Sequence, residues 1–126
     1  MPKILVVEDE RDIRDLIGFT LRFAGFEVVS VVNGLEALEK APRERPDLII
    51  LDVRMPKMTG YEVCRRLKEN PATSAIPVVF LSAKGQETEI EQGLASGAVE
   101  YIVKPFAPDE LIDQVRDILQ RAGAST

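Results

Sequence analysis

Five short apolar segments recur along the chain, separated by longer segments of mixed polar and apolar character. They are rich in Val and Ile and cover residues 4–7, 28–32, 48–51, 78–81 and 99–103. Short, nearly continuous apolar runs of this composition indicate strands that are buried on both faces, as in parallel sheets.

Hydrophobic residues between these segments recur at helical spacing. The clearest sets are Ile13, Leu16, Ile17, Leu21 and Ala24 near the start of the chain, and Leu111, Ile112, Val115, Ile118 and Leu119 near its end. Gly25 and Gly97 stand where a left-handed C-terminal cap would close a helix before the next strand. The Asn33-Gly34 pair precedes a helical stretch, which favours a strand-to-helix turn over a hairpin.

Strand and helix alternate five times in this pattern. Parallel strands need crossover connections, and those crossovers place helices over both faces of the sheet. The pattern therefore predicts an α/β fold: a doubly wound five-stranded parallel sheet of order 2-1-3-4-5 in a flavodoxin-like three-layer sandwich. A chain of 126 residues, 45% of them hydrophobic, suits one domain, which we expect over residues 1–122 with a short flexible tail at 123–126.

Charge and composition narrow the range of partners. The net charge of -5 and a pI near 4.8 argue against nucleic-acid binding through phosphate contacts, and suit protein partners or cations. The sequence offers no signal-peptide core and no run approaching the ~18 apolar residues of a membrane span. We therefore expect a cytoplasmic protein that binds neither nucleic acid nor membrane.

Two residue counts exclude common kinds of site. The single cysteine, Cys64, cannot form a disulfide within the chain, and a redox role for it is a poor expectation. The chain contains no histidine, which excludes imidazole bases, Ser-His-Asp triads and histidine zinc sites.

Polar residues follow four of the five apolar segments. Glu8 and Asp9 follow the first, Asp52 the third, Ser82 the fourth and Lys104 the fifth. In open α/β sheets the ligand crevice forms at the carboxyl ends of the strands, where the strand order reverses. In the predicted order this point lies between the first and third strands, so Glu8, Asp9 and Asp52 should meet there.

Three neighbouring carboxylates need a compensating cation. A like-charged pair ~4 Å apart costs on the order of 4 kcal/mol at an effective dielectric constant near 20. Hard oxygen ligands indicate Mg²⁺ or Ca²⁺, and a site with few carboxylates and room for water and phosphate oxygens favours Mg²⁺. Lys104 lies two strand spacings from Asp52, roughly 9 to 10 Å, so its long side chain could reach the site across the small Ser82. This arrangement is typical of a phosphoryl site with Asp52 as nucleophile.

Each of these residues also has a purely structural interpretation. The Glu8-Asp9 pair could be first-turn helix acids, Asp52 a turn cap, Ser82 a helix cap or turn residue and Lys104 an exposed loop lysine. All of them nevertheless fall at the same ends of the predicted strands, and that coincidence favours the functional interpretation.

Four sequence segments together resemble response-regulator receiver domains of two-component signalling, of the chemotaxis-regulator-like kind. They are KILVVEDE, DLIILDVRMPKMTGYE, IPVVFLSAK and GAVEYIVKPF, and the resemblance covers nearly the whole chain. It implies that Asp52 accepts a phosphoryl group from a sensor histidine kinase or phosphotransfer protein. It also implies that the chain is a signalling domain rather than an enzyme, and assists only its own phosphorylation and dephosphorylation.

The resemblance also implies roles for the neighbouring residues. Mg²⁺ would be held by Glu8, Asp9, Asp52 and the backbone carbonyl of Arg54, and the phosphoryl oxygens by Lys104 and Ser82. Tyr101 would turn inward as Ser82 moves toward the phosphate, and the peptide bond before Pro105 would be cis. From the residues alone, Tyr101 is interpreted as a packing aromatic.

The predicted fourth helix, about 87–96, has few apolar anchors and contains Gly93, which costs about 1 kcal/mol relative to alanine in a helix. A weakly held helix beside a phosphate site suits a two-state element. We therefore expect helix four, strand five and helix five to form the output face that controls a downstream effector protein or domain.

Three other classes share parts of this pattern. A flavodoxin-like carrier should offer phosphate donors in its first loop, where Glu8, Asp9 and Glu10 would repel the anion. A haloacid-dehalogenase-type hydrolase should carry an acid two residues after the nucleophile, where Arg54 stands. A phosphate-independent pseudo-receiver that only binds partners usually lacks site residues, and none is lost here.

Overall fold

The computed structural model describes residues 1–83, 100–104 and 106–122, and strands and helices alternate in it from residue 3 to residue 83. The elements in order are β1 (Lys3–Val7), α1 (Arg11–Phe23), β2 (Glu27–Val31), α2 (Gly34–Glu44), β3 (Leu48–Asp52), α3 (Gly60–Glu69), β4 (Val78–Ala83), β5 (Glu100–Lys104) and α5 (Pro108–Arg121). The predicted helix at 87–96, its cap Gly97, the cis peptide at Pro105 and the tail at 123–126 lie outside the described residues.

The five strands form one parallel sheet with the order β2-β1-β3-β4-β5. The predicted fold class and strand order are thus confirmed. The chain moves outward from β1 to β2 and then returns to place β3 on the other side of β1, so the carboxyl ends of β1 and β3 flank the point of reversal.

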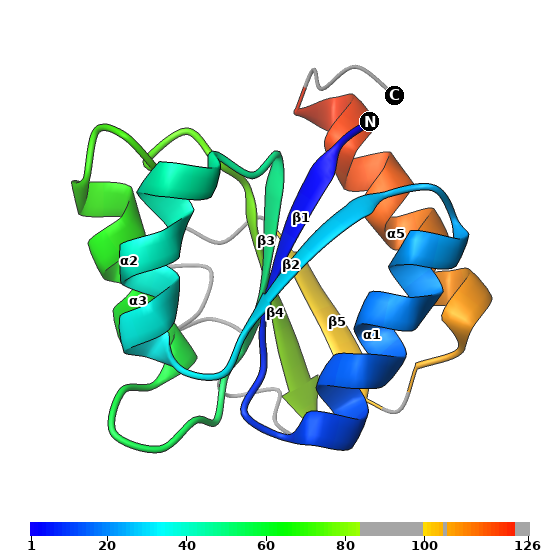
Figure 1. Cartoon of the computed structure of the whole chain (residues 1–126), viewed down its shortest axis with the longest axis horizontal. Coiled ribbons are helices and arrows are strands. Elements are labelled where there is room, and N and C mark those ends of the chain that lie inside the picture. The colour runs from blue at the N-terminus through cyan, green and yellow to red at the C-terminus, as the bar shows by residue number, and fades with distance from the viewer. Residues whose placement is uncertain (84–99, 105, 123–126) are drawn as a thin grey trace.

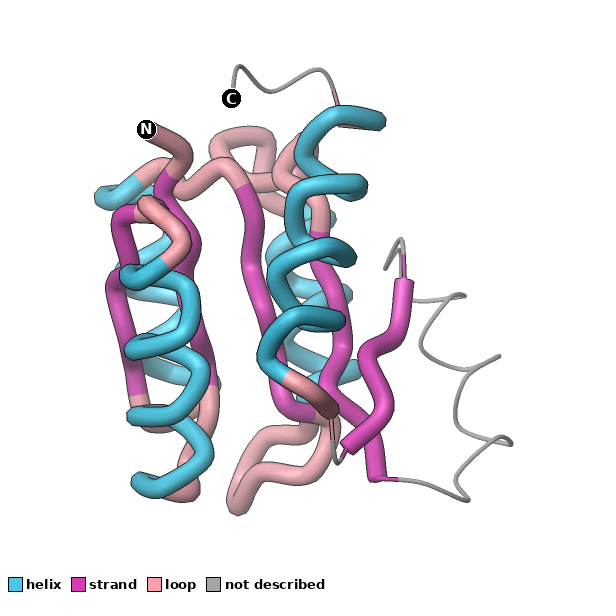
Figure 2. The backbone as a smooth tube through the Cα atoms, turned by 90° about the vertical axis from the view of Figure 1, so that its right-hand side faces the viewer, coloured by secondary structure: helices cyan, strands magenta, loops and turns pink. Residues whose placement is uncertain are grey.

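Two helical layers cover the sheet. Helices α2 and α3 lie over one face, and α1 and α5 lie over the other (Figure 1). Figure 2 shows α1 and α5 side by side in front of the strands.

Alternation along the central strands assigns side chains to these two layers. Leu5 and Val7 of β1 pack toward α2 and α3, whereas Ile4 and Val6 pack toward α1 and α5, and all four are fully buried. Because both faces are covered, these strands read as continuous apolar runs, as expected for a parallel sheet.

Local signals at the element ends act as their sequence predicts. Gly25 has a φ of 98°, the left-handed conformation expected at the end of α1. The side chain of Asn33 accepts a hydrogen bond of 2.9 Å from the backbone N–H of Glu36, so the Asn33-Gly34 pair opens α2 as a strand-to-helix turn. Pro108 occupies the first turn of α5, where its missing N–H costs no helical hydrogen bond.

Candidate functional site

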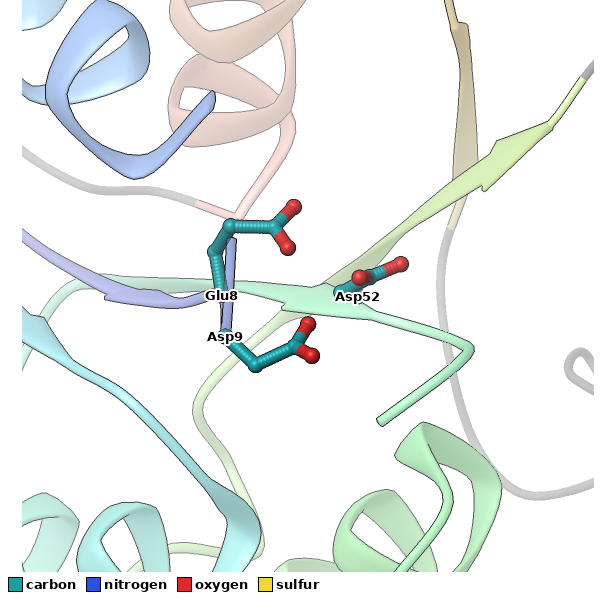
Figure 3. Close-up of side chains that lie close together, drawn as sticks. All are labelled: Glu8, Asp9 and Asp52. Atoms are coloured by element: carbon teal, nitrogen blue, oxygen red, sulfur yellow. The ribbon is translucent and has the colours of Figure 1, made fainter. Parts of the chain in front are cut away.

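An acidic cluster lies at the carboxyl ends of β1 and β3. Glu8 and Asp9 directly follow β1, and Asp52 is the last residue of β3. One carboxylate oxygen from each of the three residues lies within 4.8 Å of the others, and Figure 3 shows the side chains converging. Glu8 is fully buried and Asp52 is 5% exposed, whereas Asp9 faces solvent. The structure therefore brings together the three acids that the strand-end pattern predicted to meet.

Lys104 reaches this cluster from β5, across the intervening strand β4. Its Nζ lies 3.3 Å from Glu8 Oε1 and 3.3 Å from Asp52 Oδ1. Partial burial disfavours the ammonium ion, but attraction by Asp52 and Glu8 outweighs that effect and raises the pKa of Lys104. The lysine therefore remains a fixed positive charge between two buried carboxylates.

Glu8 has the most perturbed environment of the cluster. Burial, followed by the hydrogen bond and the charge of neighbouring Asp52, raises the pKa of Glu8 to about 8. The backbone N–H of Glu10, which donates to Glu8 Oε2 at 3.1 Å, and the charge of Lys104 oppose this rise. The protein by itself thus does not fully compensate the charge of the two buried acids.

The chain after Asp52 is held by backbone contacts. The N–H of Val53 donates to the carbonyl of Leu81 at 3.1 Å, and the N–H of Gly60 donates to the carbonyl of Val53 at 2.9 Å. A Cβ on Gly60 would lie 2.3 Å from the carbonyl oxygen of Asp52, a distance that real Cβ atoms essentially never show. Only glycine fits between α3 and the end of β3.

Ser82 is buried near the end of β4, the strand between those that carry Asp52 and Lys104. Asp52 pairs in register with Leu81, and the next two residues of β4 pair with Val103 and Lys104. Ser82 therefore lies one residue closer than Leu81 to the carboxyl edge of the sheet, as the sequence order predicted.

Tyr101 packs inward in this structure. Its ring lies 5.4 Å from that of Phe80, and its hydroxyl donates to the hydroxyl of Tyr61 at 3.2 Å. Sequence reasoning did not single out Tyr61 or Gly60. For Gly60 the signal was a glycine at the start of a helix soon after the acidic strand end, whereas no local pattern indicated that Tyr61 meets a residue forty positions away.

An open hollow of about 400 Å³ lies beside the acidic cluster. It is lined by Asp9, Glu10, Asp52, Val53, Arg54, Leu81 and Lys104. A larger hollow of about 820 Å³ lies at the amino ends of the strands, beside Pro2, Phe26 and Asp47, away from the cluster. Carboxylates within ligand distance of a small common space, one of them exposed, are the donor set of a hard divalent cation such as Mg²⁺ or Ca²⁺.

The chain matches the family model of the response regulator receiver domain over residues 4–116. It belongs to this family, whose members are signalling domains of two-component systems rather than enzymes that turn over other molecules. Receiver domains bind Mg²⁺ in an acidic site, and this chain carries a cluster of three acids, Glu8, Asp9 and Asp52, at the sheet edge.

Known proteins similar to this chain agree with that assignment. The phosphate regulon transcriptional regulatory protein PhoB of Rhizobium meliloti is 44% identical over 97% of this chain and 54% of its own length. The chemotaxis protein CheY4 of Vibrio cholerae has a TM-score of 0.89 and 36% identity, covering 94% of this chain and 98% of that one. The chain spans about half the length of the curated relatives it matches, which are transcriptional regulators.

A third similar structure contains a metal ion. The receiver domain of a sensor histidine kinase from Pseudomonas aeruginosa has a TM-score of 0.84 and 32% identity, covering 98% of each chain, and carries a magnesium ion in its active-site cleft. Within residues 1–83, 100–104 and 106–122 of the present chain, no helix has the length and apolar character needed to cross a membrane.

Proposed function

We propose that this chain accepts a phosphoryl group on Asp52 in a Mg²⁺-dependent reaction, with a sensor histidine kinase or phosphotransfer protein as donor. The observation that carries this proposal is the position of Asp52. Its carboxylate lies within 4.8 Å of two other acids and 3.3 Å from a lysine ammonium, beside an open hollow at the sheet edge. A nucleophile held between a cation site and a fixed positive charge suits phosphoryl transfer.

Glu8, Asp9, Asp52 and the backbone carbonyl of Arg54 are the residues that would hold Mg²⁺. The bound ion supplies charge neutralisation for phosphoryl oxygens and for the crowded acids. The exposure of Asp9 and the incomplete compensation at Glu8 support this assignment.

Lys104 and Ser82 would contact the phosphoryl oxygens. The ammonium of Lys104 already contacts Asp52. Ser82 lies on β4, the strand between those that carry Asp52 and Lys104, and its hydroxyl can donate to an anionic oxygen. A phosphoryl group on Asp52 would give the ammonium a new partner, because the transferred oxygens carry more charge than the carboxylate.

The transfer forms one bond and breaks one. A carboxylate oxygen of Asp52 bonds to phosphorus while the bond from phosphorus to the donor nitrogen breaks, and the electron pair of that bond stays on the donor imidazole. The product is an aspartyl phosphate. The chain's own residues act by holding Asp52 in place and by stabilising the negative charge, which is the main demand of phosphoryl transfer.

Phosphorylation would change the conformation of Ser82 and Tyr101, and with them the face made by the predicted fourth helix, β5 and α5. That face would control the partner. Tyr101 and Val103 lie on β5, and the side chain of Val103 is 44% exposed. An exposed apolar side chain on the strand that ends the sheet suits a protein partner, and the acidic net charge of this chain favours a protein over nucleic acid. The partner is a downstream effector protein or domain, and we place the chain in the cytoplasm.

Intact mass spectrometry after incubation with acetyl phosphate and Mg²⁺ tests the phosphoacceptor. The wild-type protein should gain the mass of one phosphoryl group, and Asp52→Ala should gain none. Asp113→Asn, at an exposed aspartate on α5, is the matched control and should behave as wild type. Phosphoryl addition that persists in Asp52→Ala would move the acceptor to another residue.

A further inference from the structure

Three aromatic rings connect α3 to the edge strand β5. The ring of Tyr61 lies 5.1 Å from that of Phe80 with an edge-to-face angle of 70°, and Phe80 lies 5.4 Å from Tyr101. Phe80 is fully buried, and its strand neighbour in register on β5 is Tyr101. Spacings of this size are those of interacting aromatic pairs.

A hydrogen bond joins the two ends of this row. The hydroxyl of Tyr101 donates to the hydroxyl of Tyr61 at 3.2 Å, across forty positions of sequence. Tyr61 is only 9% exposed, so its own position is fixed by packing against the core. The bond therefore ties the tip of a half-buried tyrosine on an edge strand to a well-held residue of the interior.

Tyr61 is also attached to the acidic site. It follows Gly60 directly, and Gly60 donates its N–H to the carbonyl of Val53 and packs against the carbonyl of Asp52. The first turn of α3 is further fixed by Thr59, whose hydroxyl accepts from the N–H of Glu62 at 3.3 Å. The residue that directly precedes Tyr61 therefore lies in close contact with the backbone of Asp52.

We propose that Tyr61 is a positioning residue for Tyr101: its hydroxyl holds the Tyr101 ring inward against Phe80, and Gly60 couples it to the backbone of Asp52. The second half of this inference rests on the proposed function, in which Asp52 takes the phosphoryl group. The path from Asp52 to β5 through α3 is separate from any path through Ser82 on β4. The orientation of Tyr101 would then depend on the acidic site from two sides.

The sequence makes this pair easy to observe. The chain has two tyrosines, Tyr61 and Tyr101, and no tryptophan. Protein labelled with 3-fluorotyrosine should therefore give two fluorine NMR resonances. In Tyr61→Phe only the Tyr101 resonance is left, while residue 61 keeps an aromatic ring. The difference in its frequency between H₂O and D₂O reports how exposed the Tyr101 ring is.

In unmodified protein, the Tyr101 resonance of Tyr61→Phe should shift, and its solvent isotope effect should grow. Tyr101→Phe should shift the Tyr61 resonance in return, which tests the bond from its other end if one variant folds poorly. Cys64→Ala, which changes another buried side chain of α3, is the control and should leave the Tyr101 resonance in place. A Tyr101 resonance with the same frequency and isotope effect in Tyr61→Phe as in wild type would overturn the inference.

Acetyl phosphate and Mg²⁺ then test the coupling, with phosphoryl incorporation followed by intact mass in the same samples. At equal incorporation, the change of the Tyr101 resonance on phosphorylation should differ in size between Tyr61→Phe and wild type. An equal movement in both proteins would overturn the coupling to Asp52. A wild-type protein that takes up no phosphoryl group would contradict the proposed function, whereas the comparison of unmodified proteins would still decide the role of Tyr61.

Discussion

Lys104 and Asp52 lie 3.3 Å apart, although they stand on strands β5 and β3 and the whole of β4 lies between those strands. The same ammonium contacts Glu8 at 3.3 Å. One lysine thus contacts two buried carboxylates, although β4 separates its own strand from theirs. A small residue, Ser82, stands near the carboxyl end of β4, the strand that the lysine side chain crosses.

Removing the lysine charge should destabilise the metal-free protein. Lys104→Met leaves Glu8 and Asp52 facing each other without a cation, so the free energy of unfolding should fall by about 1–3 kcal/mol, less than for a fully buried pair because the lysine is partly exposed. Urea unfolding in EDTA measures this change. Lys40→Met, at an exposed lysine of α2, should change stability little, and equal losses in both variants would argue against charge compensation.

Removing one acid should have the opposite effect. The pKa of Glu8 in the folded protein is raised to about 8, above its value of 4.5 in an unfolded chain, so folding favours the protonated form. The stability contributed by this proton is present below pH 4.5 and is lost as pH rises toward 8. In EDTA at pH 8, Glu8→Gln should therefore be more stable than wild type by about 1–3 kcal/mol.

Urea unfolding between pH 5 and pH 8 checks the sign for Glu8. Wild type should lose stability relative to Glu8→Gln as pH rises over this interval. Glu110→Gln, at an exposed glutamate of α5, serves as the control and should follow wild type. A wild-type protein that gains stability over Glu8→Gln at pH 8 would contradict the description of the cluster.

Gly60→Ala tests the close approach of α3 to Asp52. The added Cβ would lie 2.3 Å from a backbone oxygen that cannot rotate away, so the end of β3 must shift. We expect a loss of about 1–3 kcal/mol in stability and slower phosphorylation by acetyl phosphate.

Gly18→Ala provides the matched comparison for Gly60. Within helix α1, its Cβ would meet the flexible end of Arg22 at 3.2 Å and lie in ordinary contact with Ser30 Oγ at 3.9 Å. Alanine is favoured over glycine inside a helix by about 1 kcal/mol, so this variant should be stabilised or unchanged. Equal phosphorylation rates in both alanine variants would show that Gly60 does not position Asp52.

The fold was predictable because burial on both faces leaves a continuous apolar signal in each central strand. The ends of the strands were less predictable. The third and fourth apolar segments stop at 51 and 81, but the strands continue to Asp52 and Ala83. Backbone pairing does not depend on apolar side chains, so hydrogen bonds extend into the polar residues that form the site.

The convergence of Glu8, Asp9 and Asp52 was predictable because they follow strands whose carboxyl ends lie at the same edge of the sheet. The approach of the long Lys104 side chain to Asp52 was predictable for the same reason. The complete burial of Glu8 was not, because a residue just after a strand can point either into the protein or toward solvent. The contact between Tyr61 and Tyr101 was also invisible in the sequence, since it depends on two side-chain orientations from distant elements.

Reductive trapping of the acyl phosphate tests the central claim most directly. Wild-type protein is treated with acetyl phosphate in Mg²⁺ or in EDTA, reduced with borohydride, and digested for mass spectrometry, so that a phosphorylated aspartate appears as homoserine. The account predicts homoserine at position 52, formed in Mg²⁺ and strongly reduced in EDTA. Homoserine at another aspartate, or equal amounts with and without the metal, would contradict it.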